Sequence, residues 1–519
     1  MAWDDEYDVV VAGSGAGALA GALAAASNEP AAATSDAPAG ASGGLRTAVL
    51  EKTALVGGTS AYSGSAIWLP GTRVQERAGI GDSTDSARAY LRALLGDDGN
   101  AAHREAFLET APELVEFLER DPAVEFEWRA FPDYFDAPGR IDMGRSFVPL
   151  ELPLERLGEL AGIVRPPVDR DRAGRGHAAG RPLAQGRSLI GRLLLAITAT
   201  GNGDIRTGTA LTELIVEDGR VVGVAAMTAD GPVRLRASRG VLLAAGGFES
   251  SAELRASHGV PGGAGWTMAP DGANTGDAIA AAMRIGASTG LLDQAWFCPG
   301  LAMPDGRAAF TLGFRGGLIV DGTGLRFANE SLPYDRMGRR LAAADGPFYL
   351  IFDSRSDGLP AISIPTAAPE EQLAAGRWHR ADTLAGLAAK TGLPAGALAS
   401  TVERFNGFAA KNLDEDFHRG EDPYDLYFTG GKPCLVPVDR PPFIAAEIVL
   451  SDLGTKGGLR TDPDGRVLSG ADRPIPGLYA AGNTSASFTG PVYPGPGIPI
   501  GTAMAFAYRA VQAMRRNHS

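Results

Sequence analysis

The stretch from Tyr7 to Ala18 constrains the fold of this chain more than any other segment. Its first part, YDVVVA, is a short apolar run rich in β-branched residues, which is typical of a buried parallel strand. Its second part, GSGAGA, precedes an alanine-rich run that we expect to be helical to about Ser27. A strand, a glycine-rich turn and a helix in this order predict a Rossmann-like dinucleotide-binding unit.

The residues of the GSGAGA turn each have a physical role in such a unit. Gly13 permits the tight turn, Gly15 lets the backbone approach a pyrophosphate, and Ala18 allows the helix to pack closely on the strand. The helix N-terminus offers unpaired N–H groups and the positive end of its dipole to phosphate. We therefore expect a cofactor-binding segment made of Gly13, Ser14, Gly15, Ala16, Gly17 and Ala18.

A second predicted strand, 47–50, ends at Glu51, the position of a carboxylate that binds a ribose hydroxyl. Glu51 lies 38 residues beyond Gly13, whereas about 20 is usual. Residues 28–45 form a low-complexity stretch of about the surplus length, which we expect to be a mobile surface loop. We therefore interpret Glu51 as a cofactor ligand, with a solvated strand-end glutamate as the alternative.

Three further features favour FAD over NAD as the dinucleotide. A second glycine pair follows Glu51 closely, and residues 211–227 predict a hairpin before the strand and turn VLLAAGG, 241–247. That order is similar to FAD domains of the glutathione-reductase type, and GLYAAGN, 477–483, resembles the strand that closes over the FAD ribitol. We predict FAD contacts from Lys52, Gly57, Gly58, Thr59, Ser60, Ala210, Ala245, Gly246, Gly247, Gly482, Asn483, Ile498 and Ile500.

Length and composition exclude several other classes of protein. A chain of 519 residues is too long for one ordinary core, and a formal net charge of −13 argues against nucleic-acid binding. Two cysteines and six scattered histidines predict neither a disulfide framework nor a metal site. The acidic start MAWDDEYD and the weakly apolar Gly/Ala run predict a cytoplasmic protein, which is compatible with peripheral membrane contact.

The texture of the sequence changes between about 295 and 455, where aromatic residues, prolines and short mixed segments replace the alternation of strands and helices. We therefore expect an α/β fold with a Rossmann-like FAD-binding domain at 1–294 and 456–519. An inserted α+β catalytic domain would occupy 295–455.

This order of motifs resembles the fumarate reductase/succinate dehydrogenase flavoprotein superfamily, a likeness supported by NTGDAIAAAMRIGA, 274–287, and GGLIVDGTGLRFANES, 316–331. A dicarboxylate site needs arginine and histidine to hold two carboxylates and move protons. The predicted insert is instead rich in aromatic residues and poor in histidine. Such a lining suits a flat apolar molecule with few polar groups.

Five segments in order resemble the 3-ketosteroid Δ1-dehydrogenases: WRAFPDYF (128–135), DQAWFCPG (293–300), NESLPYDR (329–336), SDLGTKGGL (451–459) and YPGPGIPIGTAM (493–504). The resemblance covers nearly the whole chain and implies 1,2-desaturation of a 3-oxo steroid, with the C1 hydride passing to FAD N5 and the C2 proton to a tyrosine. The electron acceptor and the oligomeric state stay open. A 3-ketosteroid Δ4-dehydrogenase and a fumarate reductase-like dicarboxylate enzyme remain alternatives.

The resemblance also assigns roles to single residues. Tyr493 would donate a hydrogen bond to the steroid C3 oxygen, and the Gly497 N–H would donate a second. Tyr334 would remove the C2 proton, and Tyr134 would hydrogen-bond to Tyr334 and ease its deprotonation. Without the resemblance, a tyrosine in such a region is usually a packing residue with one hydrated end.

Other residues near these motifs have less specific roles. Phe131 and Phe310 are candidate steroid-binding residues, with core packing as the alternative. Cys298 is expected to be a buried inert thiol, because no base is placed beside it. For Asp335 and for Arg336, each taken separately, a structural ion pair or a turn cap is expected.

Overall fold

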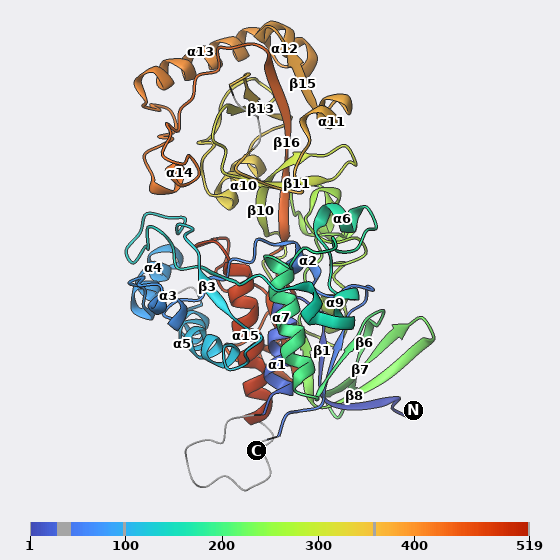
Figure 1. The fold of residues 1–519 in the computed structure, drawn as a ribbon. Coiled ribbons are helices and arrows are strands. Elements are labelled where there is room, and N and C mark those ends of the chain that lie inside the picture. The colour runs from blue at the N-terminus through green and yellow to red at the C-terminus, as the bar shows by residue number, and fades with distance from the viewer. Residues whose placement is uncertain (1, 29–42, 97–99, 356–359, 517–519) are drawn as a thin grey trace. The chain divides into compact units, whose positions relative to one another are not determined.

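The computed structural model describes residues 2–28, 43–96, 100–355 and 360–516. The chain falls into two compact units (Figure 1). Unit 1 comprises Met1–His258, Ala269–Gln294 and Gly454–Ser519, and unit 2 comprises Gly259–Met268 and Ala295–Leu453. The loop predicted at 28–45 lies mostly outside the described residues.

Unit 1 is built on a mainly parallel sheet with the strand order β18-β19-β8-β1-β2-β5. The central strand β1 pairs in parallel with β2 on one side and with β8 on the other. The predicted strand at 7–12 is confirmed and begins two residues earlier. The strands are β1 (Asp5–Ala12), β2 (Thr47–Leu50), β5 (Gly203–Arg206), β8 (Gly231–Leu243), β18 (Arg466–Leu468) and β19 (Pro474–Ala480).

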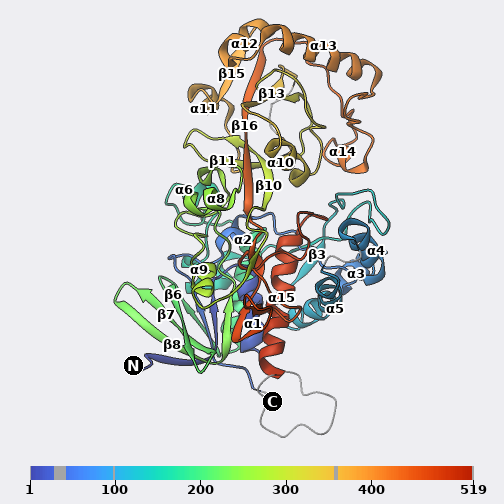
Figure 2. The same cartoon turned by 180° about the vertical axis from the view of Figure 1, so that it is seen from behind.

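Helix α1 (Ala16–Ala26) is buried along its whole length and packs against α7 (Gly186–Ala199) and α15 (Ile498–Arg516). Figure 2 shows α1 beside α15. A Cβ atom on Gly17 would lie 2.8 Å from the Ala503 carbonyl oxygen, so α15 approaches the α1 backbone directly. Helix α15 begins at Ile498, which places Ile498 and Ile500 in its first turn.

The predicted hairpin is confirmed as β6 (Ala210–Glu217) and β7 (Arg220–Thr228), and β7 also pairs with β8. Asp218 and Gly219 both have positive φ, of 48° and 75°. Positive φ at both central residues is the requirement of a type I′ turn, whose twist matches that of the flanking strands.

Unit 2 contains a seven-stranded sheet in the order β12-β13-β16-β10-β11-β14, with β15 also paired to β16. Helices α12 and α13 pack against it through a core that includes Leu318, Ile351, Leu387 and Phe405. The elements are β10 (Ala295–Ala302), β11 (Ala308–Leu312), β12 (Leu318–Val320), α10 (Tyr334–Ala342), β13 (Phe348–Phe352), β14 (Ile362–Ile364), α11 (Pro369–Ala374), β15 (Trp378–Ala381), α12 (Leu384–Thr391), α13 (Ala395–Lys411), α14 (Pro423–Tyr427) and β16 (Phe443–Thr455).

Further helices and strands complete unit 1. They are α2 (Gly58–Tyr62), α3 (Arg73–Arg77), α4 (Thr84–Leu95), α5 (Ala101–Leu118), β3 (Phe126–Trp128), β4 (Phe147–Pro149), α6 (Val168–Arg172), α8 (Ala252–His258), α9 (Asp277–Arg284), β9 (Thr289–Gly290) and β17 (Gly458–Leu459), with 3-10 turns at Leu154–Gly162 and Gly482–Thr484 and, in unit 2, at Ala264–Trp266.

The turn after β1 depends on glycine at position 13. Gly13 has a φ of 109°, and a Cβ atom there would lie 2.2 Å from the Ala244 carbonyl oxygen. Gly219 also has positive φ, but a Cβ atom on it would meet no heavy atom within 4 Å. A side chain at position 219 would therefore cause backbone strain alone, whereas a side chain at position 13 would cause both backbone strain and a steric clash.

We predict that Gly13→Ala destabilises the fold by about 2–5 kcal/mol, because left-handed strain and overpacking add. Gly219→Ala should cost about 1 kcal/mol, since it carries the strain alone. Thermal unfolding of both variants and the wild type measures the difference. Equal losses of Tm would mean that the approach of Ala244 does not constrain the turn.

Candidate functional site

The glycine-rich turn and Glu51 meet where β1 and β2 end. Ser14 Oγ donates a hydrogen bond of 2.5 Å to one carboxylate oxygen of Glu51 and accepts one from the Gly57 N–H at 3.0 Å. The other oxygen of Glu51 accepts hydrogen bonds from the N–H and the hydroxyl of Thr53, both at 2.8 Å. The Glu51 carboxylate is thus buried and held in one orientation, unlike a solvated strand-end glutamate.

The second glycine pair lies beside the first turn. The Ala16 N–H donates to Ser60 Oγ at 3.1 Å, and a Cβ atom on Gly15 would come within 3.3 Å of the same oxygen. Helix α1 carries no acidic residue in its first turn. A helix N-terminus whose first turn holds no acidic residue, entered through glycines, fits a pyrophosphate, and the buried Glu51 carboxylate fits a ribose.

A third group of segments adjoins these two through Asn274. Its side-chain amide donates to Thr59 Oγ1 at 3.0 Å and also to the buried Glu249 carboxylate. Glu249 in turn accepts a hydrogen bond of 3.2 Å from the Thr455 N–H. Asn274 and Glu249 were not predicted from the sequence, although the NTGD motif that contains Asn274 is a signal that could have identified it.

The turns that follow β8 and β19 come together in the same region. Gly246 has a φ of 80°, its carbonyl oxygen accepts a hydrogen bond of 2.8 Å from Thr484 Oγ1, and a Cβ atom on it would lie 2.8 Å from Asn274 Oδ1. Gly482 also has positive φ. Asn483 lies close to Gly454: a Cβ atom on Gly454 would be 2.3 Å from the side-chain amide nitrogen of Asn483.

Two further predicted FAD contacts, Lys52 and Ala210, differ in their surroundings. The Lys52 ammonium donates to Thr275 Oγ1 at 2.5 Å and to Asp277 at 2.8 Å, so its charge is already paired with a protein carboxylate. Ala210 opens β6 next to Thr209, whose N–H donates to the Glu51 carbonyl oxygen at 2.9 Å. Both remain predicted FAD contacts.

Two of the predicted catalytic tyrosines lie side by side in unit 1. The rings of Tyr134 and Tyr493 are 5.4 Å apart between centroids, and both residues are buried. The Tyr134 N–H donates to the Pro494 carbonyl oxygen at 3.1 Å, which ties the two segments together. The ring of Phe131 packs edge-on against Tyr134 at 6.3 Å.

Gly497 occupies a position where no side chain fits. Its φ is 94°, and a Cβ atom would lie 2.3 Å from the Ala66 carbonyl oxygen. The Gly497 carbonyl accepts a hydrogen bond from the Trp68 N–H at 3.3 Å. Its own N–H makes no hydrogen bond to any residue in the described part of the chain.

Tyr334 and Phe310, also predicted to belong to the site, lie in unit 2. Tyr334 is the first residue of α10, and Phe310 lies on β11. Tyr334 is buried, and the ring of Phe310 meets it at 86° with centroids 5.1 Å apart. Asp335 forms the expected ion pair, with Arg339 at 3.0 Å.

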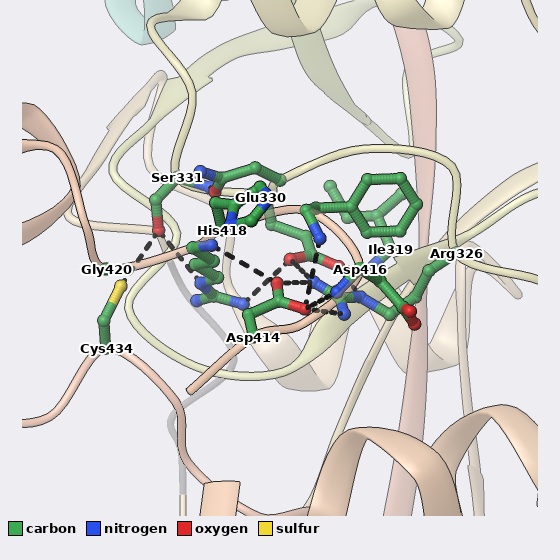
Figure 3. Close-up of polar contacts among 12 residues, drawn as sticks. Ile319, Arg326, Glu330, Ser331, Asp414, Asp416, His418, Gly420 and Cys434 are labelled. Carbon is green, nitrogen blue, oxygen red and sulfur yellow. Dashed lines mark hydrogen bonds and ion pairs between the residues drawn. The ribbon is translucent and has the colours of Figure 1, made fainter. Parts of the chain in front are cut away.

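A buried cluster of charges holds the segment that leads to Tyr334, as Figure 3 shows. Arg326 donates to both oxygens of Glu330 and pairs with Asp414 at 2.8 Å. Arg419 donates to Glu330 at 3.1 Å and to Ser331 Oγ at 3.0 Å. Because all of these side chains are almost fully buried, the path of the chain from 329 to 331 is determined by paired charges.

Cys298 behaves as expected for an inert thiol. It is fully buried on β10, and burial, together with the nearby Asp452 carboxylate, raises the pKa of its thiol well above the ordinary value. A thiol with a raised pKa is rarely ionised at neutral pH and is a poor nucleophile.

A metal site and a membrane-spanning helix are both absent from the described ranges. No group of three or more histidine, cysteine, aspartate or glutamate side chains there could hold a metal ion. No helix in these ranges is both long and apolar enough to cross a membrane.

Comparison with known proteins identifies the class of protein that this fold and site define. A family described as "FAD binding domain" matches residues 8–500, nearly the whole chain. The chain therefore belongs to the FAD-binding flavoprotein family that includes the 3-oxosteroid 1-dehydrogenases, and FAD is its cofactor.

Two individual relatives show which enzymes of this family the chain is similar to. The 3-oxosteroid 1-dehydrogenase of Rhodococcus opacus is 43% identical over 542 residues, with 99% of each chain covered. The crystal structure of 3-ketosteroid Δ1-dehydrogenase from Sterolibacterium denitrificans, in complex with 1,4-androstadiene-3,17-dione, matches with a TM-score of 0.86 and 31% identity, covering 99% of this chain and 100% of that one.

A third structure represents the alternative regiochemistry. The 3-ketosteroid Δ4-(5α)-dehydrogenase from Rhodococcus jostii RHA1, in complex with 4-androstene-3,17-dione, matches with a TM-score of 0.70 and 26% identity, covering 99% of this chain and 98% of that one. The predicted resemblance to Δ1-dehydrogenases is thus confirmed, and the fold is more similar to the Δ1 structure from Sterolibacterium denitrificans than to this Δ4 structure.

The charge cluster around Glu330 makes a prediction about stability and pH. Burial alone would raise the pKa of Glu330, but the guanidinium groups of Arg326 and Arg419 outweigh burial and hold the pKa below its ordinary 4.5. Since the pKa is lowered on folding, the stabilisation is fully present above pH 4.5 and is lost as the pH falls through the folded-state pKa.

We expect Glu330→Gln to lower the free energy of unfolding at pH 7 by about 3–5 kcal/mol, because it leaves buried guanidinium charge unpaired. The difference from wild type should shrink below pH 4.5. Urea denaturation across this pH range measures both effects. Glu421→Gln is the control, because Glu421 pairs with His418 at the surface and should leave stability unchanged.

Proposed function

We propose that this protein is an FAD-dependent dehydrogenase that introduces the 1,2 double bond into the A-ring of 3-oxo steroids. The observation that carries the proposal is the 43% identity to a 3-oxosteroid 1-dehydrogenase over 99% of both chains. The TM-score of 0.86 to a Δ1-dehydrogenase that holds a 3-oxo-1,4-diene supports it. Unit 1 is then the FAD-binding domain, and unit 2 the catalytic domain.

The reaction removes a proton from C2 and a hydride from C1, and the C1=C2 bond forms from the electron pair left at C2. Bound FAD supplies the hydride acceptor and later passes the electrons to an external acceptor, which we propose is neither oxygen nor NAD. The protein must therefore polarise the C3 carbonyl, accept the C2 proton and orient the ring.

Tyr493 and Gly497 are suited to polarise the carbonyl. A phenol hydroxyl and a backbone N–H four residues apart can both donate to one oxygen, as in an oxyanion hole. Their turn is held rigidly, since the Val492 carbonyl accepts hydrogen bonds from Lys456 at 2.6 Å and from Thr489 Oγ1 at 2.8 Å. Rigid donors lose little energy to reorganisation as negative charge develops on the substrate oxygen.

Tyr334 is the proposed base, and Tyr134 its hydrogen-bonding partner. A free phenol has a pKa of about 10, so a neighbouring donor that stabilises the phenolate helps it accept a proton near neutral pH. Phe310 packs on Tyr334 and Phe131 packs on Tyr134. These two rings are proposed to bind the apolar steroid faces, since a flat hydrocarbon substrate is best matched by aromatic walls.

Anaerobic titration of the FAD-loaded protein tests the proposed function. Addition of 4-androstene-3,17-dione should bleach the flavin absorbance and yield the 1,4-diene, whereas succinate should leave the spectrum unchanged. Bleaching by succinate alone would favour the dicarboxylate alternative. With a saturated 5α-3-ketone, a 4-ene product without any 1-ene would favour the Δ4 alternative.

We expect Tyr334→Phe to abolish turnover while FAD content and steroid binding remain close to wild type. Tyr493→Phe should lower kcat by about 10²–10³-fold, because one donor to the developing oxyanion is lost. Steady-state kinetics per bound FAD measure both effects. Tyr349→Phe, a partly exposed tyrosine on β13 of unit 2, is the matched control and should keep normal kcat. Near-normal turnover by Tyr334→Phe would exclude Tyr334 as the base.

A further inference from the structure

We infer that Tyr90, on α4, is a positioning residue for the reaction: its hydroxyl joins the segment that carries Tyr134 to the turn that carries Tyr493. This inference rests on the proposed function, because it concerns the geometry of those two phenols. Tyr90 contributes no reacting group, and it acts through the backbone of the residues that follow each tyrosine.

The hydroxyl of Tyr90 makes two hydrogen bonds. It donates to the Pro494 carbonyl oxygen at 2.8 Å and accepts from the Phe135 N–H at 3.1 Å. Phe135 directly follows Tyr134, and Pro494 directly follows Tyr493. A single fully buried side chain therefore bridges the two catalytic segments one residue beyond each phenol.

The bridge is part of a closed set of contacts. The Pro494 carbonyl oxygen also accepts the Tyr134 N–H at 3.1 Å, so two donors converge on one acceptor. The result is the 5.4 Å separation between the ring centroids of Tyr134 and Tyr493. Because both segments are irregular loops, no helix or strand hydrogen bonds set that separation.

A buried group of charged side chains, Arg145 with Asp133 and Asp82, lies next to the Tyr90 ring. The Asp133 carboxylate accepts from Arg145 at 3.0 Å and from the Trp68 indole N–H at 2.8 Å, and Arg145 also pairs with Asp82 at 2.7 Å. The Arg145 guanidinium lies 5.6 Å from the centroid of the Tyr90 ring. All of these charged side chains have no solvent exposure, so their positions are tightly constrained.

The Tyr493 turn rests directly on this group. A Cβ atom on Gly495 would lie 2.6 Å from the Trp68 indole nitrogen and 2.8 Å from the Asp133 carboxylate. The Ser146 hydroxyl donates to the Pro496 carbonyl oxygen at 2.5 Å. The turn that carries Tyr493 therefore packs against Asp133, the immediate neighbour of Tyr134. A shift of the Tyr493 turn would displace the Tyr134 segment, and the reverse also holds.

Tyr90→Phe tests the inference, because it removes the bridging oxygen and keeps the ring that packs against Trp68 and Arg145. We expect kcat per bound FAD to fall on the order of 10- to 100-fold, since small misplacements of catalytic groups have effects of this size. KM, FAD content and Tm should change little. Tyr508→Phe is the matched control, because it removes a comparably buried hydroxyl that donates to Glu113 at 2.9 Å, and it should keep wild-type kcat.

A second variant, Trp68→Phe, removes the indole N–H that donates to Asp133, and the inference requires a similar selective fall in kcat. Unchanged kcat in Tyr90→Phe would overturn the inference. So would loss of FAD or of folding in Tyr90→Phe, because the hydroxyl would then serve stability and not alignment. A wild-type protein that the steroid does not reduce would instead contradict the proposed function itself.

Discussion

The parallel pairing around β1 is the constraint on which the rest of the structure depends. Strands β1, β2, β8 and β19 run in the same direction, so their carboxyl ends share one edge of the sheet. The Gly13 N–H donates to the Leu50 carbonyl oxygen and the Ala244 N–H donates to the Ala12 carbonyl oxygen, both at 2.8 Å. These bonds place the turns that bind dinucleotides in FAD-binding proteins next to one another, and the cofactor site follows from sheet topology.

Buried ion pairs hold in place the segments that carry the proposed catalytic residues. In unit 1, Asp133 and Arg145 locate the segments of Tyr134 and Tyr493, and in unit 2, Glu330 and Arg419 locate the approach to Tyr334. Such pairs add little net stability over well-packed apolar side chains. Their directional hydrogen bonds do determine the course of an irregular loop, which apolar packing does less well. The loops that carry the proposed catalytic residues are therefore held by ion pairs in both units.

Much of the fold and part of the site could be predicted from local sequence. The strand at 7–12, the helix after it and the hairpin at Asp218-Gly219 follow from periodicity and turn chemistry that act within a few residues. The start of α15 at Ile498 could not be predicted, because the prolines and glycines around it obscure where the helix begins. Glu249 and Tyr90 were missed, since their partners lie far away in the sequence and leave no local pattern.

The sequence by itself determined the glycine-rich turn, the candidate acidic ligand Glu51 and the family to which the chain belongs, because these rest on residue types at fixed short spacings. The tertiary structure alone decided that the Lys52 ammonium pairs with Asp277 and that one hydroxyl joins the segments after Tyr134 and Tyr493. The physical reason is that a hydrogen bond forms between atoms that folding brings within about 3 Å, whatever their separation along the chain.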